Sequence, residues 1–159
     1  MRHGPAEDQA GTGRDFDRKL TSNGRARTEL VARELGVRGE RPKYVVSSPL
    51  RRTIETAEVV VATLGLDLEI EVRDELAPGG NAPGLVRELA SSGAKRVMLI
   101  GHEPDVSALT AHLFPTWSRG FDKAMVVGLK IERGGSEQGA AKCRFVIEPK
   151  RIGDQTTRN

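Results

Sequence analysis

The sequence predicts an α/β fold: a three-layer α/β/α sandwich with a mostly parallel sheet and an antiparallel hairpin at the carboxyl end. Segments with the spacing of amphipathic helices alternate with short β-branched runs, an order typical of layered α/β domains. The last two apolar runs are separated by the glycine-rich segment 133–139, which favours a hairpin. A chain of 159 residues suits one domain, expected over residues 1–159.

The first half of the chain predicts a helix, a strand and a second helix. Residues 20–36 carry apolar side chains at helical spacing, with Thr21 as N-cap and Gly36 as the stop. Residues 42–48 are a short β-branched run that ends in two serines, which indicates a strand. Residues 49–65 again place apolar side chains on one face and end at a glycine, so they predict a helix.

The second half continues the alternation. A loop rich in proline and glycine is expected over residues 76–84, and helices over residues 85–93 and 104–114, the latter opened by a proline. The strands expected in this half are residues 68–72, 96–101, 123–132 and 141–148. The run 96–101 is apolar throughout, as expected for a buried strand.

Composition narrows the classes of function. The formal net charge is +3, and the arginines are scattered among acidic residues with little aromatic interleaving, which disfavours nucleic acid and favours small anions such as phosphate. No apolar stretch reaches membrane-spanning length, so no membrane partner and a cytoplasmic location are expected. The single cysteine, Cys143, excludes an internal disulfide and is expected to be buried and inert.

Reactive side chains follow the expected strands. Ser47, Ser48 and His102 stand directly after strands, and the opening segment Arg2–Gly4 is expected to end beside them. In open α/β sheets, ligands bind beyond the carboxyl ends of strands. Two imidazoles and at least two guanidinium groups would then meet in one crevice, a combination suited to holding phosphate.

Three motifs resemble one known family. Arg2–Gly4 is an RHG motif, residues 46–57 read VSSPLRRTIETA, and residues 101–104 read GHEP. In this order they resemble the histidine phosphatase superfamily, whose fold is phosphoglycerate-mutase-like. The short length, the segment 17–24 (DRKLTSNG) and the loop 74–80 (DELAPGG) are similar to the SixA-type phosphohistidine phosphatases. These short members lack the insertions that cap the site in larger ones.

The resemblance implies a role for each catalytic residue. His3 is expected to attack phosphorus and form a phosphohistidine intermediate, which water then hydrolyses. Arg2 and Arg52 are expected to bind the phosphoryl oxygens, and His102 to hold one of them in the transition state. Arg52 aligns with the family position, so Arg51 is interpreted as a surface or rim residue that could assist. No cofactor and no metal are expected.

Other polar residues receive a structural interpretation or none. Ser48 and Pro49 are expected to cap and start a helix, and His112 to be structural or exposed. The general acid is left unassigned. Its candidates are Asp74 and Glu75 on one side and Glu7 and Asp8 on the other.

Three functions remain open at this point. The first is a phosphatase of phosphohistidine in a signalling phosphotransfer protein, the second a phosphatase of small phosphoesters, and the third a non-catalytic phosphate-binding module. The joint presence of His3, Arg52 and His102 disfavours the third, because family members without catalysis would be expected to lose the nucleophile first. The oligomeric state is not predicted.

The start of the sequence raises a separate expectation. Family members carry a short hydrophobic strand directly before RHG, at the centre of the sheet, whereas only Met1 precedes it here. Without that strand, its two neighbours would lose hydrogen-bonding partners. We expect either that the sequence starts late, with Met1 standing where an internal strand residue belongs, or that something else fills the slot, and we favour the late start.

Overall fold

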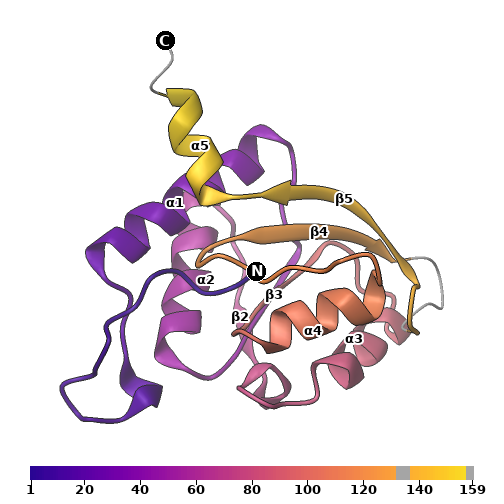
Figure 1. Cartoon of the computed structure of the whole chain (residues 1–159), viewed down its shortest axis with the longest axis horizontal. Coiled ribbons are helices and arrows are strands. Elements are labelled where there is room, and N and C mark those ends of the chain that lie inside the picture. Colours follow the sequence, from indigo (N-terminus) through magenta and orange to yellow (C-terminus); the bar gives the residue numbers. More distant parts are fainter. Residues whose placement is uncertain (132–136, 157–159) are drawn as a thin grey trace.

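The computed structural model describes residues 1–131 and 137–156, of which 153–156 are described by their backbone alone (Figure 1). Its strands are β1 (Tyr44–Ser47), β2 (Ile70–Val72), β3 (Val97–Ile100), β4 (Val126–Ile131) and β5 (Ala141–Ile147). Its helices are α1 (Ser22–Val37), α2 (Arg51–Leu64), α3 (Ala82–Ser91), α4 (Asp105–Leu113) and α5 (Pro149–Thr156), with 3-10 turns η1 (Asp15–Asp17) and η2 (Asp74–Leu76). Part of the expected hairpin loop, residues 132–136, lies outside the described residues.

The differences from the sequence-based expectation are local. Helix α3 begins inside the expected loop 76–84, because the Asn81 side chain accepts a hydrogen bond from the Gly84 N–H and Pro83 fits the first turn. Strand β2 is shorter than expected, and α5 was not predicted. Cys143 is exposed rather than buried, because β5 is the outer strand of the hairpin and its middle residues lack a covering layer.

The central sheet is parallel, with strand order β2-β1-β3, and the hairpin β4-β5 is antiparallel, which confirms the predicted fold class. Alternate residues of β1 point to opposite layers: Val45 packs into a cluster with α1 and α2, whereas Val46 packs into a cluster with α3. Figure 1 shows α1 and α2 on one side of the sheet, with α3 and α4 on the other. The sheet is therefore the middle layer of a sandwich.

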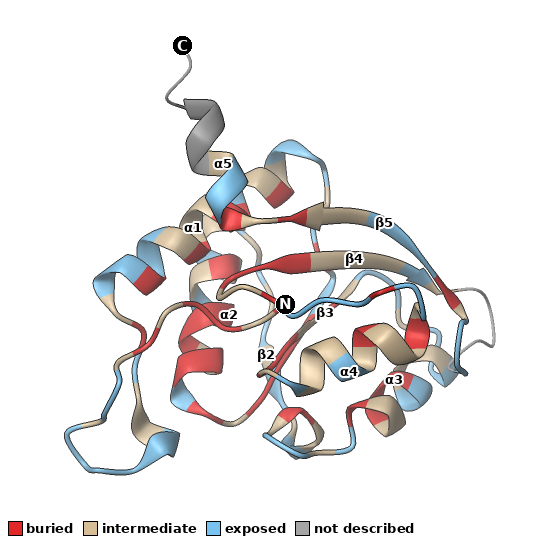
Figure 2. Cartoon of the chain, in the orientation of Figure 1, coloured by how far each residue is buried: buried red, intermediate tan, exposed pale blue. Residues whose placement is uncertain are grey.

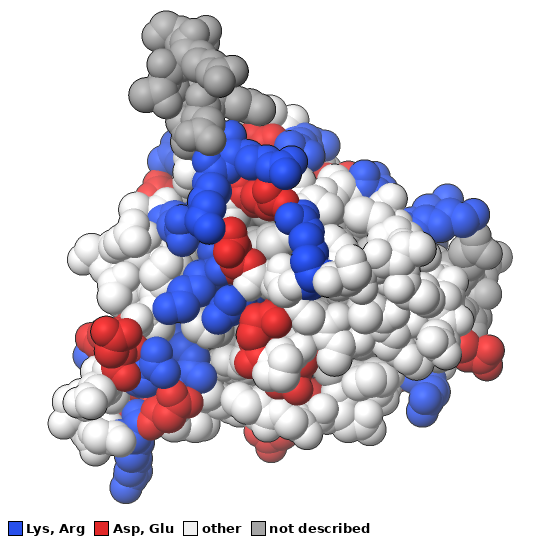
Figure 3. Space-filling view, viewed as in Figure 1, with Lys and Arg blue, Asp and Glu red and all other residues white. Residues whose placement is uncertain are grey.

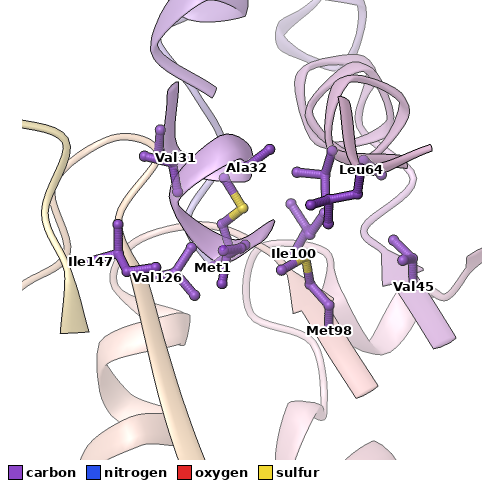
Figure 4. Close-up of a cluster of buried hydrophobic side chains, with 13 residues drawn as sticks. Met1, Val31, Ala32, Val45, Leu64, Met98, Ile100, Val126 and Ile147 are labelled. Atoms are coloured by element: carbon purple, nitrogen blue, oxygen red, sulfur yellow. The ribbon is translucent and has the colours of Figure 1, made fainter. Parts of the chain in front are cut away.

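The first three residues join the hairpin to the central sheet. The Met1 amino group donates to the Leu99 carbonyl at 2.8 Å, and the Gly101 N–H donates to the Met1 carbonyl, so this segment runs parallel to β3. On its other side the Arg2 N–H donates to the Met125 carbonyl. The Met1 side chain lies at the centre of the main hydrophobic cluster (Figure 4).

A cavity of about 1070 Å³ extends from this point between β3 and β4. Its wall includes Met1, Met98 and Leu99 on one side and residues of β4 such as Leu129 on the other. Among the described residues, β3 forms a ladder with β1 alone and β4 with β5 alone. Met1–His3 lies at one end of this cavity, where Arg2 bridges to Gly101.

Charge is distributed unevenly over the face that holds the N-terminus. Figure 3 shows lysine, arginine and acidic side chains interspersed on the side of α1, α2 and α5, whereas the area over α4 and β4 is largely uncharged. Within the described part of the chain, no helix has both the length and the apolar character needed to cross a bilayer.

Candidate active site

The residues expected to form one site lie together at the carboxyl ends of the strands. His3 ends the N-terminal segment, His102 follows β3, and Arg52 lies in the first turn of α2, directly after β1. All three are buried, and the ring centroids of His3 and His102 are 5.3 Å apart. The structure therefore brings together three side chains that are up to about a hundred positions apart in the sequence.

The turn after His3 is fixed by close packing and by one buried hydroxyl. A Cβ atom on Gly4 would lie 2.5 Å from the Thr28 hydroxyl oxygen, so only glycine fits there. The Gly4 N–H donates to Thr56 Oγ1 at 3.1 Å, and the Thr56 hydroxyl donates to the Arg52 carbonyl at 2.6 Å. Thr56 thus links the RHG turn to the helix that carries Arg52.

The hydrogen bonding of His3 defines its tautomer. Its Nδ1 lies 2.7 Å from the Gly4 carbonyl oxygen, which can only accept, so Nδ1 carries the proton and Nε2 has the free lone pair. The pKa of His3 is lowered to about 4, mainly by burial. The hydrogen bond to Gly4 acts in the opposite direction, whereas the positive charges of Arg52 and Arg2 lower the pKa further. The imidazole is therefore neutral at pH 7, the form that nucleophilic attack requires.

His102 is held by a residue that sequence reasoning set aside. Its Nε2 lies 2.8 Å from the hydroxyl of Ser48, while its Nδ1 is buried without a partner. Burial lowers the pKa of His102 to about 3, assisted by the charge of Arg52. The expectation that Ser48 caps the helix is wrong in detail, because Leu50 is the N-cap and lacks a side-chain bond there. The pair of serines, Ser47 and Ser48, at the end of the β1 run was the feature of the sequence that could have indicated this contact.

The two arginines of the site are held differently. Arg2 Nη1 donates to the Phe121 carbonyl at 2.6 Å, and its Nε is buried without a partner. Arg52 Nη1 donates to the main-chain carbonyl of Asp15 and Nη2 to the Asp15 carboxylate. Asp15 was not singled out in the sequence, because the turn 15–17 has no periodic or motif signal that points to it.

The remaining candidates lie outside this cluster or are engaged elsewhere. Arg51 is half-exposed and pairs with the buried carboxylate of Glu55 one turn later in α2, which agrees with a rim position. Glu75 pairs with Arg73, and a Glu7 carboxylate oxygen accepts the Lys19 N–H. The structure thus does not single out a general acid among the four candidates.

The described residues contain no group of three or more histidine, cysteine, aspartate or glutamate side chains placed to hold a metal ion. His112 lies in the last turn of α4, and its carbonyl accepts a hydrogen bond from the Gly139 N–H just before β5. What the cluster offers instead is a neutral imidazole beside the buried guanidinium group of Arg52 and the partly buried one of Arg2. This combination suits nucleophilic attack on an anionic phosphorus centre.

Comparison with known proteins places this geometry in a family. Residues 1–96 match the model of the histidine phosphatase superfamily (branch 1). An uncharacterized protein of Picosynechococcus sp. is 39% identical over 110 residues, which cover 67% of this chain and 66% of that protein, just under two thirds of its length. The phosphohistidine phosphatase SixA of Escherichia coli is 37% identical over 119 residues, 72% of each chain.

Solved structures with the same fold include several SixA proteins. The protein histidine phosphatase SixA complexed with tungstate superimposes with a TM-score of 0.85 at 28% identity, covering 96% of both chains. A SixA protein from Agrobacterium tumefaciens gives a TM-score of 0.75 at 26% identity, over 94% of this chain and 96% of that one. A mycobacterial glucosyl-3-phosphoglycerate phosphatase gives 0.66 at 25% identity, over 90% and 93%.

Proposed function

The chain belongs to the histidine phosphatase superfamily, and from this premise we propose that it removes the phosphoryl group from phosphohistidine on a signalling phosphotransfer protein. The similarity to SixA supports this substrate class. The observation that carries the proposal is the His3 ring, whose Nδ1 donates to the Gly4 carbonyl and whose pKa is lowered to about 4. A metal-independent reaction and a cytoplasmic location are parts of the same proposal.

In the first step, Nε2 of His3 attacks the phosphorus atom. A bond forms between Nε2 and phosphorus, and the bond from phosphorus to the substrate imidazole breaks. The leaving nitrogen takes the electron pair and is protonated; imidazole is basic enough for this without a dedicated strong acid. Arg2 and Arg52 bind the phosphoryl oxygens and neutralise the charge that develops on them.

His102 contributes a hydrogen bond to the same oxygens. The Ser48 hydroxyl, which accepts the Leu50 N–H at 3.4 Å, is assigned as the donor to Nε2 of His102. In that arrangement neutral His102 carries its own proton on Nδ1, the buried nitrogen without a partner. That N–H is the donor we assign to the phosphoryl oxygen in the transition state.

In the second step, water attacks the phosphorus of phosphorylated His3. A bond forms between the water oxygen and phosphorus while the bond between Nε2 and phosphorus breaks and leaves its electron pair on Nε2. One water proton stays on the released inorganic phosphate or passes to solvent, and the imidazole returns to its neutral form. Splitting the hydrolysis in this way replaces one difficult displacement by two easier ones. The Thr56 and Gly4 contacts keep the ring in place through both steps.

A substrate panel tests the proposal. Phosphohistidine peptide and a phosphorylated phosphotransfer domain are compared with p-nitrophenyl phosphate, sugar phosphates and nucleotides by their kcat/KM values, with His3→Ala as the blank. We expect the phosphohistidine substrates to be preferred at least about tenfold. A higher kcat/KM for a sugar phosphate or nucleotide would instead indicate a small-molecule phosphatase. Phosphate binding without turnover of any substrate would indicate a binding module.

A further inference from the structure

The guanidinium group of Arg52 already has an anionic partner in this structure. Its Nη1 donates to the Asp15 carbonyl at 2.9 Å and its Nη2 to Asp15 Oδ2 at 3.0 Å, so one residue occupies both tips of the fork. The Arg52 side chain is 7% exposed, whereas that of Asp15 is 59% exposed. A buried cation expected to bind phosphate is therefore covered from outside by a surface carboxylate.

The same carboxylate binds a second arginine. Asp15 Oδ1 accepts from Arg18 Nη1 at 2.7 Å, while Arg18 Nε donates to the Glu7 carbonyl. The bonds from Arg18 and then Arg52 lower the pKa of Asp15, so it is ionised at neutral pH. Its charge also reaches His102, whose pKa it raises. A carboxylate between two guanidinium groups makes the contacts that two oxygens of a phosphoryl group would make.

The segment that carries Asp15 is anchored at its base and unburied at its tip. At the base, Ala6 pairs with Leu20 and the Glu7 N–H donates to the Lys19 carbonyl. Turn η1 (Asp15–Asp17) contains no buried residue, and Figure 2 shows the loop before it as exposed. Displacing Asp15 from Arg52 therefore exposes no hydrophobic core.

We propose that Asp15 is an internal competitor for the phosphate position and sets the affinity of the site for phosphoryl groups. This inference rests on the proposed function. A phosphoryl group displaces the Asp15 carboxylate and carbonyl from Arg52, and Arg18, released from the same carboxylate, becomes a further donor to the phosphoryl oxygens. The apparent dissociation constant for phosphate is then the intrinsic dissociation constant divided by the fraction of molecules in which Asp15 is displaced from Arg52.

Equilibrium binding of inorganic phosphate, followed by isothermal titration calorimetry, tests this without turnover. The variants are Asp15→Asn, which keeps the shape but loses the charge, and Asp15→Ala. The matched control is Asp17→Asn, which removes a charge from the same turn without touching Arg52, since Asp17 bonds to Thr12. We expect Asp15→Asn and Asp15→Ala to bind phosphate about three- to tenfold more tightly than the wild type, and Asp17→Asn to stay within about twofold.

Kinetics provide the second measurement. Displacement of a competitor predicts a lower KM for p-nitrophenyl phosphate in Asp15→Asn with no increase in kcat, a split that general loosening of the loop would not give. Wild-type-like or weaker phosphate binding by both Asp15 variants, with wild-type binding intact, overturns the inference and leaves the proposed function standing. Failure of the wild type itself to bind phosphate overturns both.

Discussion

The Thr56 hydroxyl accepts the Gly4 N–H next to His3, the proposed nucleophile, and its removal gives the most direct test of the site geometry. Thr56→Val keeps the size of a fully buried side chain but removes the acceptor of the Gly4 N–H. A buried donor left without a partner costs about 1–3 kcal/mol. For a domain of this size, that corresponds to a fall in Tm of roughly 3–10 °C.

Activity should fall more than stability. The Gly4 carbonyl orients the His3 ring, so a shift of this turn displaces Nε2 from the line of attack. Misplacement by about 1 Å can cost roughly a hundredfold in rate, so we expect kcat for p-nitrophenyl phosphate to fall about ten- to a hundredfold with little change in KM.

Thr110→Val is the matched control for this variant. Thr110 is also buried in a helix and also donates to a carbonyl four residues earlier, that of Val106. It makes no described bond to the RHG turn, so Thr110→Val should retain full kcat. Equal loss of kcat in the two variants, or full kcat in Thr56→Val, would refute the positioning role of Thr56.

Three further predictions concern the chemistry. His3→Ala should abolish turnover and the trapping of labelled phosphate on the protein. His102→Ala should slow turnover severely while phosphate still binds. A His3→Ala variant that keeps a tenth of wild-type turnover would exclude His3 as the nucleophile. Burial lowers the pKa of His3 to about 4. After correction for substrate ionisation, kcat/KM should therefore stay level down to about pH 5 and fall at lower pH. A fall centred near the ordinary histidine pKa of 6.5 would contradict the buried, neutral ring. Activity should be unaffected by EDTA, and its loss on chelation with recovery on adding zinc or magnesium would contradict the metal-independent mechanism.

The same histidines give stability a pH dependence. The pKa values of His3 and His102 are lower in the folded chain than the ordinary 6.5, so the unfolded chain binds protons first as the pH falls. This contribution to stability is complete above about pH 6.5 and is lost as the pH falls to about 4 for His3 and to about 3 for His102. Urea unfolding at pH 7 and pH 5 measures it, and His102→Gln should reduce the difference.

The sequence predicts the positions of the candidate catalytic residues better than it predicts their hydrogen-bonding partners. His3, Arg52 and His102 are found from motifs because each stands at a strand end or in a first helical turn, where the fold dictates convergence. Asp15 and Ser48 are engaged through contacts between elements that are distant in sequence. No local pattern encodes the distance between Ser48 and His102 or the approach of the Asp15 loop to Arg52, so these contacts require the three-dimensional structure.

The sequence likewise predicts some elements of the fold and misses others. Helices α1 and α2 follow directly from apolar spacing and a glycine stop. Helix α5 is not predicted, because it is short and strongly polar apart from Ile152, which packs against the main cluster. Cys143 is placed wrongly, because alternation along a strand does not tell whether the strand is central or at an edge.

The last prediction concerns the cavity between β3 and β4. Met1–His3 fixes the direction in which a longer strand would run: parallel to β3, and antiparallel to the segment that leads into β4, where the Ala124 N–H donates to the His3 carbonyl. Burial lowers the pKa of the Met1 amino group to about 5, so this group lies in an apolar surrounding. Five apolar residues fused before Met1 would extend into the cavity of about 1070 Å³ and reach the second edges of β3 and β4.

We expect such an extension, for example Val-Ile-Val-Leu-Val, to stabilise the fold. Each inward aliphatic side chain contributes about 1.5–3 kcal/mol on burial, against about 1–2 kcal/mol for ordering each residue. With hydrogen bonds to both edges at about 0.5–1.5 kcal/mol each, the net gain is a few kcal/mol, or roughly 5–10 °C in Tm. The control is an extension of the same length made of glycine and serine. An equal Tm for the two extensions would show that the edges of β3 and β4 do not accept a strand.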